Sequence, residues 1–106
     1  MTVNYLELPT GPDPPAIINA IIEIPPHTAN KYEYDKQFNV FKLDRALFSP
    51  VHYPGAYGFI PRTLAEDDDP LDVLVLLDGY CFTGALIEVR PLGVLEMKDD
   101  KGFDHK

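Results

Sequence analysis

Hydrophobic residues occur along this chain in short runs that proline and glycine interrupt. Ile17 to Ile24 is a β-branched run that ends at Pro25-Pro26, and Lys31 to Tyr34 alternates charged and aromatic residues with the period of a strand. Lys31 and Glu33 are therefore expected to share one strand face. Six of the eleven prolines precede residue 27, so we expect loop and strand rather than a central helix in this part of the chain.

The same pattern of short extended segments continues to the end of the chain. A turn is expected at Asp35 to Asn39, and Pro91 is expected to bend the chain between the last two segments. Short strands joined by loops favour a small barrel or a sandwich. The further strands that we expect are Val40 to Leu43, Asp72 to Leu77, Ala85 to Arg90 and Leu92 to Met97.

Length and composition indicate one globular domain, residues 1–106. A chain of 106 residues is able to bury about two-thirds of its unfolded surface, and 45% hydrophobic residues disfavour disorder. The lone Cys81 is unable to form an internal disulfide, which is typical of a reducing compartment, although a small apolar filler also explains it. No Lys or Arg precedes Lys31, and Asn19 and Glu23 interrupt the apolar run, so we expect no signal peptide, no membrane span and a cytoplasmic location.

The net charge of the chain disfavours anionic macromolecules as partners and limits how a small anion could bind. The net charge is −8 and the nine basic residues are scattered, which disfavours nucleic acid and anionic membrane surfaces as partners. An anionic ligand would need bound cations to reverse the field of the carboxylates.

The segment EDDDPLD at residues 66–72 places five carboxylates immediately before an apolar run. A solvated surface loop is one interpretation. In an extended backbone, however, Asp67 and Asp69 point to the same side, and Asp72 shares a strand face with Leu74 and Leu76. Carboxylates gathered in this way repel one another unless a divalent cation holds them, and oxygen ligands suit magnesium, manganese or calcium.

Two other segments carry candidate chemistry of lower specificity. Asp99, Asp100 and Asp104 surround an expected turn at Gly102, and a hydrophilic tail explains them equally well. The run YPGAYGF at residues 53–59 supplies tyrosine hydroxyls that are able to donate to an anion, but core packing or a turn also accounts for it. The three histidines show no zinc spacing with one another or with the cysteine.

Six short segments follow one another in a specific order: IIEIP, KYEYD, LDR, YPGAYGF, DDDPLDVLV and GVLEMKDDKGFDHK. In this order they resemble the soluble inorganic pyrophosphatases of family I, whose signature is Asp-x-Asp-Pro-hydrophobic-Asp followed by an apolar residue. The resemblance extends from about Leu8 to Lys106. It implies a mainly β fold with a small OB-like β-barrel, and magnesium-dependent hydrolysis of pyrophosphate to two orthophosphates, with Mn2+ as another possible cofactor.

The resemblance also implies a role for each matching residue. Asp69 would accept a hydrogen bond or a proton from the attacking water, while Glu23 and Tyr53 would have supporting roles. The implied phosphate-binding residues are Lys31, Arg45, Tyr57 and Lys106. The implied metal ligands are Asp67, Asp72, Asp99, Asp104 and Glu33.

The chain departs from the family in one respect. Members continue for several tens of residues beyond the position of Lys106, with more barrel and a long C-terminal helix, so this chain resembles a C-terminally truncated member. Two hypotheses follow: a magnesium-dependent pyrophosphate hydrolase, or an inactive β-barrel module that binds divalent metal or associates with itself. We expect a homo-oligomer, because an apolar barrel flank would be exposed without that helix.

Overall fold

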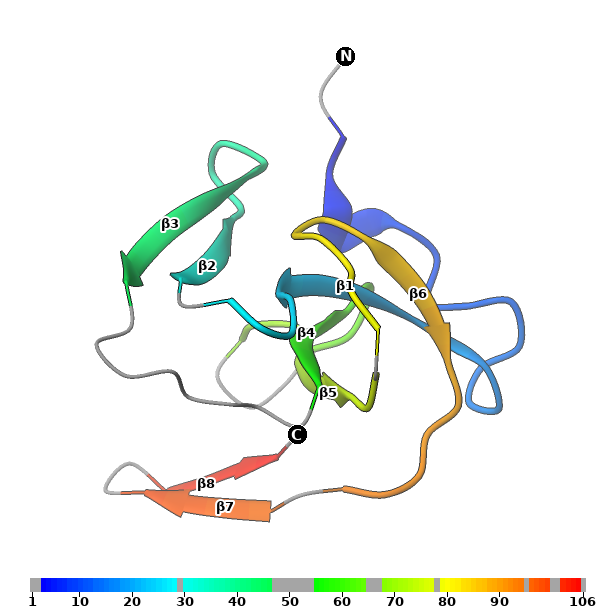
Figure 1. Ribbon diagram of the computed structural model, residues 1–106. Coiled ribbons are helices and arrows are strands. Elements are labelled where there is room, and N and C mark those ends of the chain that lie inside the picture. Colours follow the sequence, from blue (N-terminus) through cyan, green and yellow to red (C-terminus); the bar gives the residue numbers. More distant parts are fainter. Residues whose placement is uncertain are drawn as a thin grey trace.

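The computed structural model describes residues 3–28, 30–46, 55–64, 68–77, 79–94, 96–99 and 102–105, with the backbone alone for residues 45, 46, 96–99 and 102–105. Figure 1 shows a short 3-10 helix followed by strands in three sheets. The elements are η1 (Tyr5–Glu7), β1 (Ile18–Ile24), β2 (Asn30–Asp35), β3 (Val40–Ala46), β4 (Ala56–Ile60), β5 (Leu71–Val75), β6 (Leu86–Val89), β7 (Glu96–Asp99) and β8 (Gly102–His105).

A four-stranded antiparallel sheet with the order β5-β4-β1-β6 forms the centre of the molecule. Its inner strand β1 is buried at every position except Glu23, which is partly buried. Apolar β-branched residues suit such a strand because both of its faces are covered. Ala20 and Ile22 form the core with Ala56, Val75 and Ala85 from the neighbouring segments.

The pairing of β1 with β4 contains an irregularity at Glu23. Ile22 pairs with Gly58 and Ile24 pairs with the adjacent Tyr57, so Glu23 is an additional residue on β1 relative to β4. An extra residue of this kind bends the strand and redirects a side chain.

The β2–β3 hairpin is fixed by polar contacts around its turn. The Asp35 carboxylate accepts hydrogen bonds from the backbone N–H groups of Gln37 at 2.9 Å and Phe38 at 3.1 Å. The Tyr34 hydroxyl donates to Asn39 Oδ1 at 2.7 Å, and Asn39 adopts a left-handed conformation with φ of 57°. Asparagine tolerates this conformation better than most residues, which explains its place at the end of the turn.

Aromatic rings pack this hairpin against the sheet and the N-terminal segment. Tyr34 lies 5.6 Å from Phe59 of β4 between ring centroids, and 5.5 Å from Tyr5 of η1. The ring of Phe41 on β3 lies 4.9 Å from that of Tyr5. The hairpin is thus held to the sheet by apolar contact as well as by the chain connection.

The observed strands confirm the mainly β prediction and correct several details. The strand in YPGAYGF, β4, was not predicted, because its two glycines favoured a turn. The predicted strand from Leu92 to Met97 is wrong, since residues 92–94 are not extended in a sheet and β7 begins at Glu96. Gly102 opens β8 instead of forming a turn, and Leu76 lies beyond the end of β5.

The predicted barrel is not closed by backbone pairing in the described part of the chain. The strands form the four-stranded sheet and two separate hairpins, β2–β3 and β7–β8. None of the described segments is a helix with the length and apolar character needed to cross a bilayer.

Gly58 provides a test of how closely β1 and β4 approach. A Cβ atom at this position would collide with the backbone carbonyl oxygen of Ile21, which has no freedom to move away. We therefore expect Gly58→Ala to lower the free energy of unfolding by at least about 2 kcal/mol, as strained core substitutions do. Urea denaturation measures this loss, and Gly79→Ala is the matched control because a Cβ there meets nothing within 4 Å. Equal stabilities of the two variants would contradict this account of the contact.

Candidate functional site

Glu23 carries a largely buried carboxyl group at the edge of the core. Its Oε2 atom accepts a hydrogen bond of 2.9 Å from the backbone N–H of Tyr34 on β2. Burial raises the pKa of Glu23 from its ordinary value of 4.5 to about 7. The Tyr34 hydrogen bond and the Lys31 ammonium lower this pKa, whereas the negative charges of Asp72 and Glu33 raise it further. Carboxylates from β1, β2 and β5 therefore interact at one place.

The β2–β3 hairpin contributes a lysine held between two carboxylates. Lys31 Nζ lies 3.2 Å from Glu33 Oε1 and 3.7 Å from Asp44 Oδ2. The pair Lys31 and Glu33 confirms that these residues share a strand face. Lys31 pairs with Arg45 in the ladder and Tyr32 pairs with Leu43, so Asp44 is an additional residue on β3.

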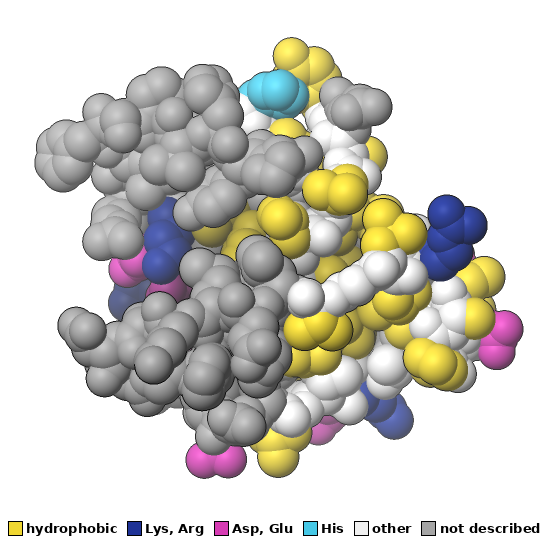
Figure 2. All heavy atoms as spheres, turned by 90° about the horizontal axis from the view of Figure 1, so that it is seen from below, with side chains coloured by type: hydrophobic (Ala, Val, Ile, Leu, Met, Phe, Trp, Pro, Cys, Tyr) yellow, Lys and Arg dark blue, Asp and Glu magenta, His cyan; other side chains and the backbone are white. Residues whose placement is uncertain are grey.

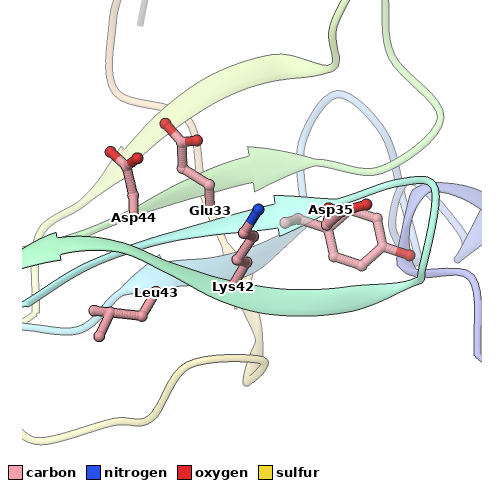
Figure 3. Close-up of a pocket in the computed structure, with 6 residues that line it drawn as sticks. Glu33, Asp35, Lys42, Leu43 and Asp44 are labelled. Carbon is pink, nitrogen blue, oxygen red and sulfur yellow. The ribbon is translucent and has the colours of Figure 1, made fainter.

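A cavity of about 340 Å³ lies along this hairpin. Figure 3 shows Glu33 and Asp44 pointing the same way from neighbouring strands, whereas Leu43 points in the opposite direction. Glu33 is the one predicted site residue in the cavity lining, so the cavity marks the hairpin side of the site. The lining residues are Glu33, Tyr34, Asp35, Lys42, Leu43 and Asp44.

The loop before β5, residues 68–70, is called the acidic loop below, and it contacts the β2–β3 hairpin through an ion pair. Asp69 Oδ1 accepts a hydrogen bond of 3.3 Å from Lys36 Nζ in the β2–β3 turn. Asp68 has a φ of 65°, so the expectation of an extended backbone from Asp67 through Asp69 is wrong at this residue. The left-handed turn there redirects the loop before Pro70 leads into β5.

Two further predicted residues lie on the central sheet. Asp72 is partly buried on β5 and pairs with Phe59, and its charge acts on Glu23. Tyr57 is partly buried on β4 and pairs with Leu74 of β5. The sheet thus brings Glu23 and Asp72 together from strands that are far apart in the sequence.

Several predicted site residues lie outside what the structure describes. Asp67, Tyr53 and Lys106 are not among the described residues, and the described backbone of Arg45, Asp99 and Asp104 gives no side-chain position. Asp99 stands opposite Gly102, and Asp104 opposite Met97, in the β7–β8 hairpin.

Sequence reasoning did not assign roles to Asp44 and Lys36. Asp44 adjoins Arg45 in the LDR segment, but its place beside Lys31 depends on the extra residue in β3. Nothing in the spacing of Lys36 and Asp69, 33 positions apart, indicates that they meet.

The described carboxylates fit a divalent cation in their chemistry. Within the described residues, no group of three or more His, Cys, Asp or Glu side chains is arranged to hold a metal ion. Glu33 and Asp72 nevertheless supply hard oxygen donors within electrostatic reach of a third, Glu23. Their mutual repulsion and the burial of Glu23 are both costs that a bound cation would offset.

Comparisons with known proteins agree on one family. Residues 20–106 match the family described as inorganic pyrophosphatase. The chain is 48% identical over 101 residues to an inorganic pyrophosphatase of Sulfolobus acidocaldarius, covering 95% of this chain and 58% of that protein.

Solved structures of inorganic pyrophosphatases are also similar to this chain. The crystal structure of inorganic pyrophosphatase from Thermus thermophilus superposes with a TM-score of 0.92 at 49% identity, covering 98% of this chain and 60% of that one. A Trypanosoma cruzi vacuolar soluble pyrophosphatase, truncated at its N-terminal domain and in complex with PPi, superposes with a TM-score of 0.67 at 29% identity, covering 93% of this chain and 44% of that one. The chain therefore spans about 58% to 60% of the length of the more similar relatives.

The raised pKa of Glu23 predicts how the stability of the metal-free chain depends on pH. Between pH 4.5 and about 7 the unfolded chain loses the Glu23 proton while the folded chain keeps it, so stability falls as pH rises through this window. Glu23→Gln abolishes this dependence, because the amide carries no charge and its oxygen still accepts from Tyr34. We expect the variant to gain up to about 3 kcal/mol relative to the parent between these limits.

Urea denaturation in a chelating buffer at several pH values measures this difference. Glu88→Gln on β6 is the control, because Glu88 is exposed on the same sheet. The same pH slope for the parent chain and for Glu23→Gln would contradict the assignment.

Proposed function

The chain belongs to the inorganic pyrophosphatase family, and on this premise we propose that it hydrolyses inorganic pyrophosphate to two orthophosphates with the help of Mg2+. The observation that carries the proposal is that Lys31 pairs with Glu33 and that the charges of Lys31, Glu33 and Asp72 all act on Glu23, within the matched residues 20–106. The PPi complex of the Trypanosoma cruzi relative supports the choice of substrate.

In this proposal the cationic side chains of the β2–β3 hairpin bind the substrate. Lys31 leaves its ion pairs with Glu33 and Asp44 and binds phosphate oxygens. Arg45, which pairs with Lys31 in the β2–β3 hairpin, binds two further oxygens through its planar guanidinium group. Tyr57 donates its hydroxyl to the same anion, with Lys106 as an additional cation and Tyr53 in support. A strongly charged anion requires several such donors, because this chain has a net charge of −8.

Asp69 is the proton acceptor for the attacking water in this proposal. This carboxylate orients the attacking water and accepts its proton as the oxygen approaches one phosphorus atom. The bond from that phosphorus to the bridging oxygen then breaks, and the second phosphate leaves with that oxygen. Asp69 suits the role because its side chain is 59% exposed beside the hairpin and is accessible to water.

The metal ligands in this proposal are Asp67, Asp72, Asp99 and Asp104, together with Glu33. When bound, Mg2+, or Mn2+ in its place, supplies positive charge that offsets the repulsion between the nucleophile and the anionic substrate and lowers the pKa of water. Asp72 is held by the β4–β5 ladder, which keeps its carboxylate in a defined place. Glu23 would add negative charge beside Asp72 and Glu33 on losing its proton, a loss that a cation bound at this position would favour.

Phosphate release from pyrophosphate tests the proposal directly. We expect the purified chain to release phosphate only with Mg2+, and Asp72→Asn to lower the rate by about 10- to 100-fold, as loss of metal-supporting groups does. Asp13→Asn is the matched control, because Asp13 is exposed and pairs with Ile17 at the opposite end of β1 from Glu23. Release no greater than that of Asp72→Asn would contradict the proposal and favour an inactive metal-binding or self-associating module.

We further propose that the chain forms a homo-oligomer in the cytoplasm. Figure 2 shows hydrophobic side chains gathered over one side of the described surface. Phe82 is 70% exposed and Leu92 is 74% exposed, which is high for large apolar side chains. The free thiol of Cys81 is consistent with a reducing compartment.

Sedimentation velocity tests the oligomer. We expect a species heavier than the 11.9 kDa chain whose share increases with concentration, because apolar surface is buried on association. Phe82→Ser combined with Leu92→Ser should shift the distribution toward the monomer, whereas Lys42→Ser on the hairpin should not. A parent chain that sediments as a monomer at all concentrations would refute this proposal.

A further inference from the structure

Thr63 forms hydrogen bonds to both β4 and β5 at the end of the ladder where the acidic loop enters the sheet. Its hydroxyl oxygen accepts a hydrogen bond of 2.8 Å from the backbone N–H of Leu71, the first residue of β5. The same hydroxyl donates at 2.6 Å to the backbone carbonyl oxygen of Ile60, the last residue of β4. Ile60 and Leu71 are the last pair of the β4–β5 ladder. One partly buried hydroxyl therefore joins the two positions at which the chain leaves the sheet and returns to it.

The turn that carries Thr63 is held by the N-terminal segment. Arg62 has a φ of 57°, in the left-handed region that residues with long side chains seldom adopt. Such a conformation persists where the surrounding structure holds it. The backbone N–H of Arg62 donates to the carbonyl oxygen of Leu6 at 2.9 Å, and its Nε donates to that of Glu7 at 2.8 Å. The Thr63 hydroxyl is thus presented to the ladder from a turn that η1 fixes on the other side.

The Thr63 bridge acts on the backbone next to Asp72. Pro70 has no N–H to donate, so Leu71 supplies the first backbone donor after the acidic loop. Asp72 follows directly and pairs with Phe59 in the ladder. The ladder therefore restrains the backbone of Asp72 from the β5 side, and the bond from Leu71 to Thr63 restrains it from the loop side.

Two backbone groups depend on this one hydroxyl. Ile60 is buried and Leu71 is partly buried, so an N–H or a carbonyl group that lost its partner here would be costly to leave unpaired. Valine has nearly the shape of threonine but no hydrogen-bonding group. A valine at position 63 would therefore force the start of β5 to move toward other partners, and Asp72 would move with it.

We propose that Thr63 is a positioning residue that, through Leu71, sets the direction in which the Asp72 carboxylate faces a divalent cation. The inference rests on the proposed function, which assigns Asp72 as a metal ligand, and it adds a residue that touches neither metal nor substrate. Mg2+ requires nearly ideal octahedral geometry, so a displaced oxygen ligand weakens its binding.

Amide hydrogen exchange, measured by nuclear magnetic resonance in the metal-free chain, tests the bridge. We expect Thr63→Val to accelerate exchange of the Leu71 N–H about tenfold relative to that of Val73, and Thr63→Ser to keep the parent ratio. Val73 is the internal reference, because N–H groups two residues apart lie along the same edge of a strand. A general loss of stability would accelerate both amides equally. The parent ratio in Thr63→Val would overturn the proposal.

Mg2+ binding, measured by isothermal titration calorimetry, tests the consequence for the metal. We expect Thr63→Val to raise the Kd for Mg2+ about tenfold, the lower end of the range for groups that orient metal ligands, and Thr63→Ser to match the parent. Thr10→Val is the matched control, because the Thr10 hydroxyl donates at 3.1 Å to the carbonyl oxygen of Pro61 in the same turn. We expect its Kd to equal that of the parent. An unchanged Kd in Thr63→Val, or an equal rise in Thr10→Val, would overturn the proposal.

Phosphate release separates this inference from the proposed function. If the parent chain binds Mg2+ but releases no phosphate, the proposed function fails, and the Kd values still decide the role of Thr63. If the parent releases phosphate and Thr63→Val binds Mg2+ as the parent does, the proposed function stands and the inference fails. A parent chain that binds no Mg2+ would overturn both.

Discussion

The contact between the Glu23 carboxyl group and the Tyr34 backbone N–H joins the two main parts of this protein. Glu23 is the one position of β1 that is not fully buried, and it is an extra residue in the pairing of β1 with β4. A carboxyl group in such a place is costly unless it is hydrogen-bonded or protonated. The N–H of β2 satisfies it, and the same bond brings the β2–β3 hairpin to the edge of the central sheet.

The charge distribution follows from this junction. The acids of the sheet and the acids of the hairpin face a common region, so their repulsion requires positive charge nearby. Lys31 supplies it within the hairpin, between Glu33 and Asp44, and Lys36 supplies it at the acidic loop. In the metal-free chain these lysines balance the carboxylates that the proposed function assigns to cations. In the proposed function, the Lys31 ammonium therefore lies beside these acids before a phosphate binds.

Regular strand patterns made much of the fold predictable. The β-branched run that forms β1, the alternation in β2 and the turn before Asn39 were predicted correctly, because each is a local pattern with a local cause. The strand β4 was missed because Gly55 and Gly58 suggest a turn. In the folded chain Gly58 instead lies where the backbones of β1 and β4 come close together, and this contact joins residues that are far apart in the sequence. The strand predicted after Pro91 was wrong over residues 92–94, since Leu92 and Val94 are exposed and lie outside the strands that the structure describes.

The sequence by itself determined the family, the β-rich architecture and the kinds of side chain in the site, because these depend on residue types and their order along the chain. It placed Lys31 beside Glu33, since residues two apart on a strand share a face. The tertiary structure decided which charges meet across elements. The extra residues at Glu23 and Asp44 and the left-handed turn at Asp68 redirect side chains in ways that regular periodicity does not encode. The pair of Lys36 and Asp69 exists only because the hairpin folds over the sheet, and no local pattern contains that information.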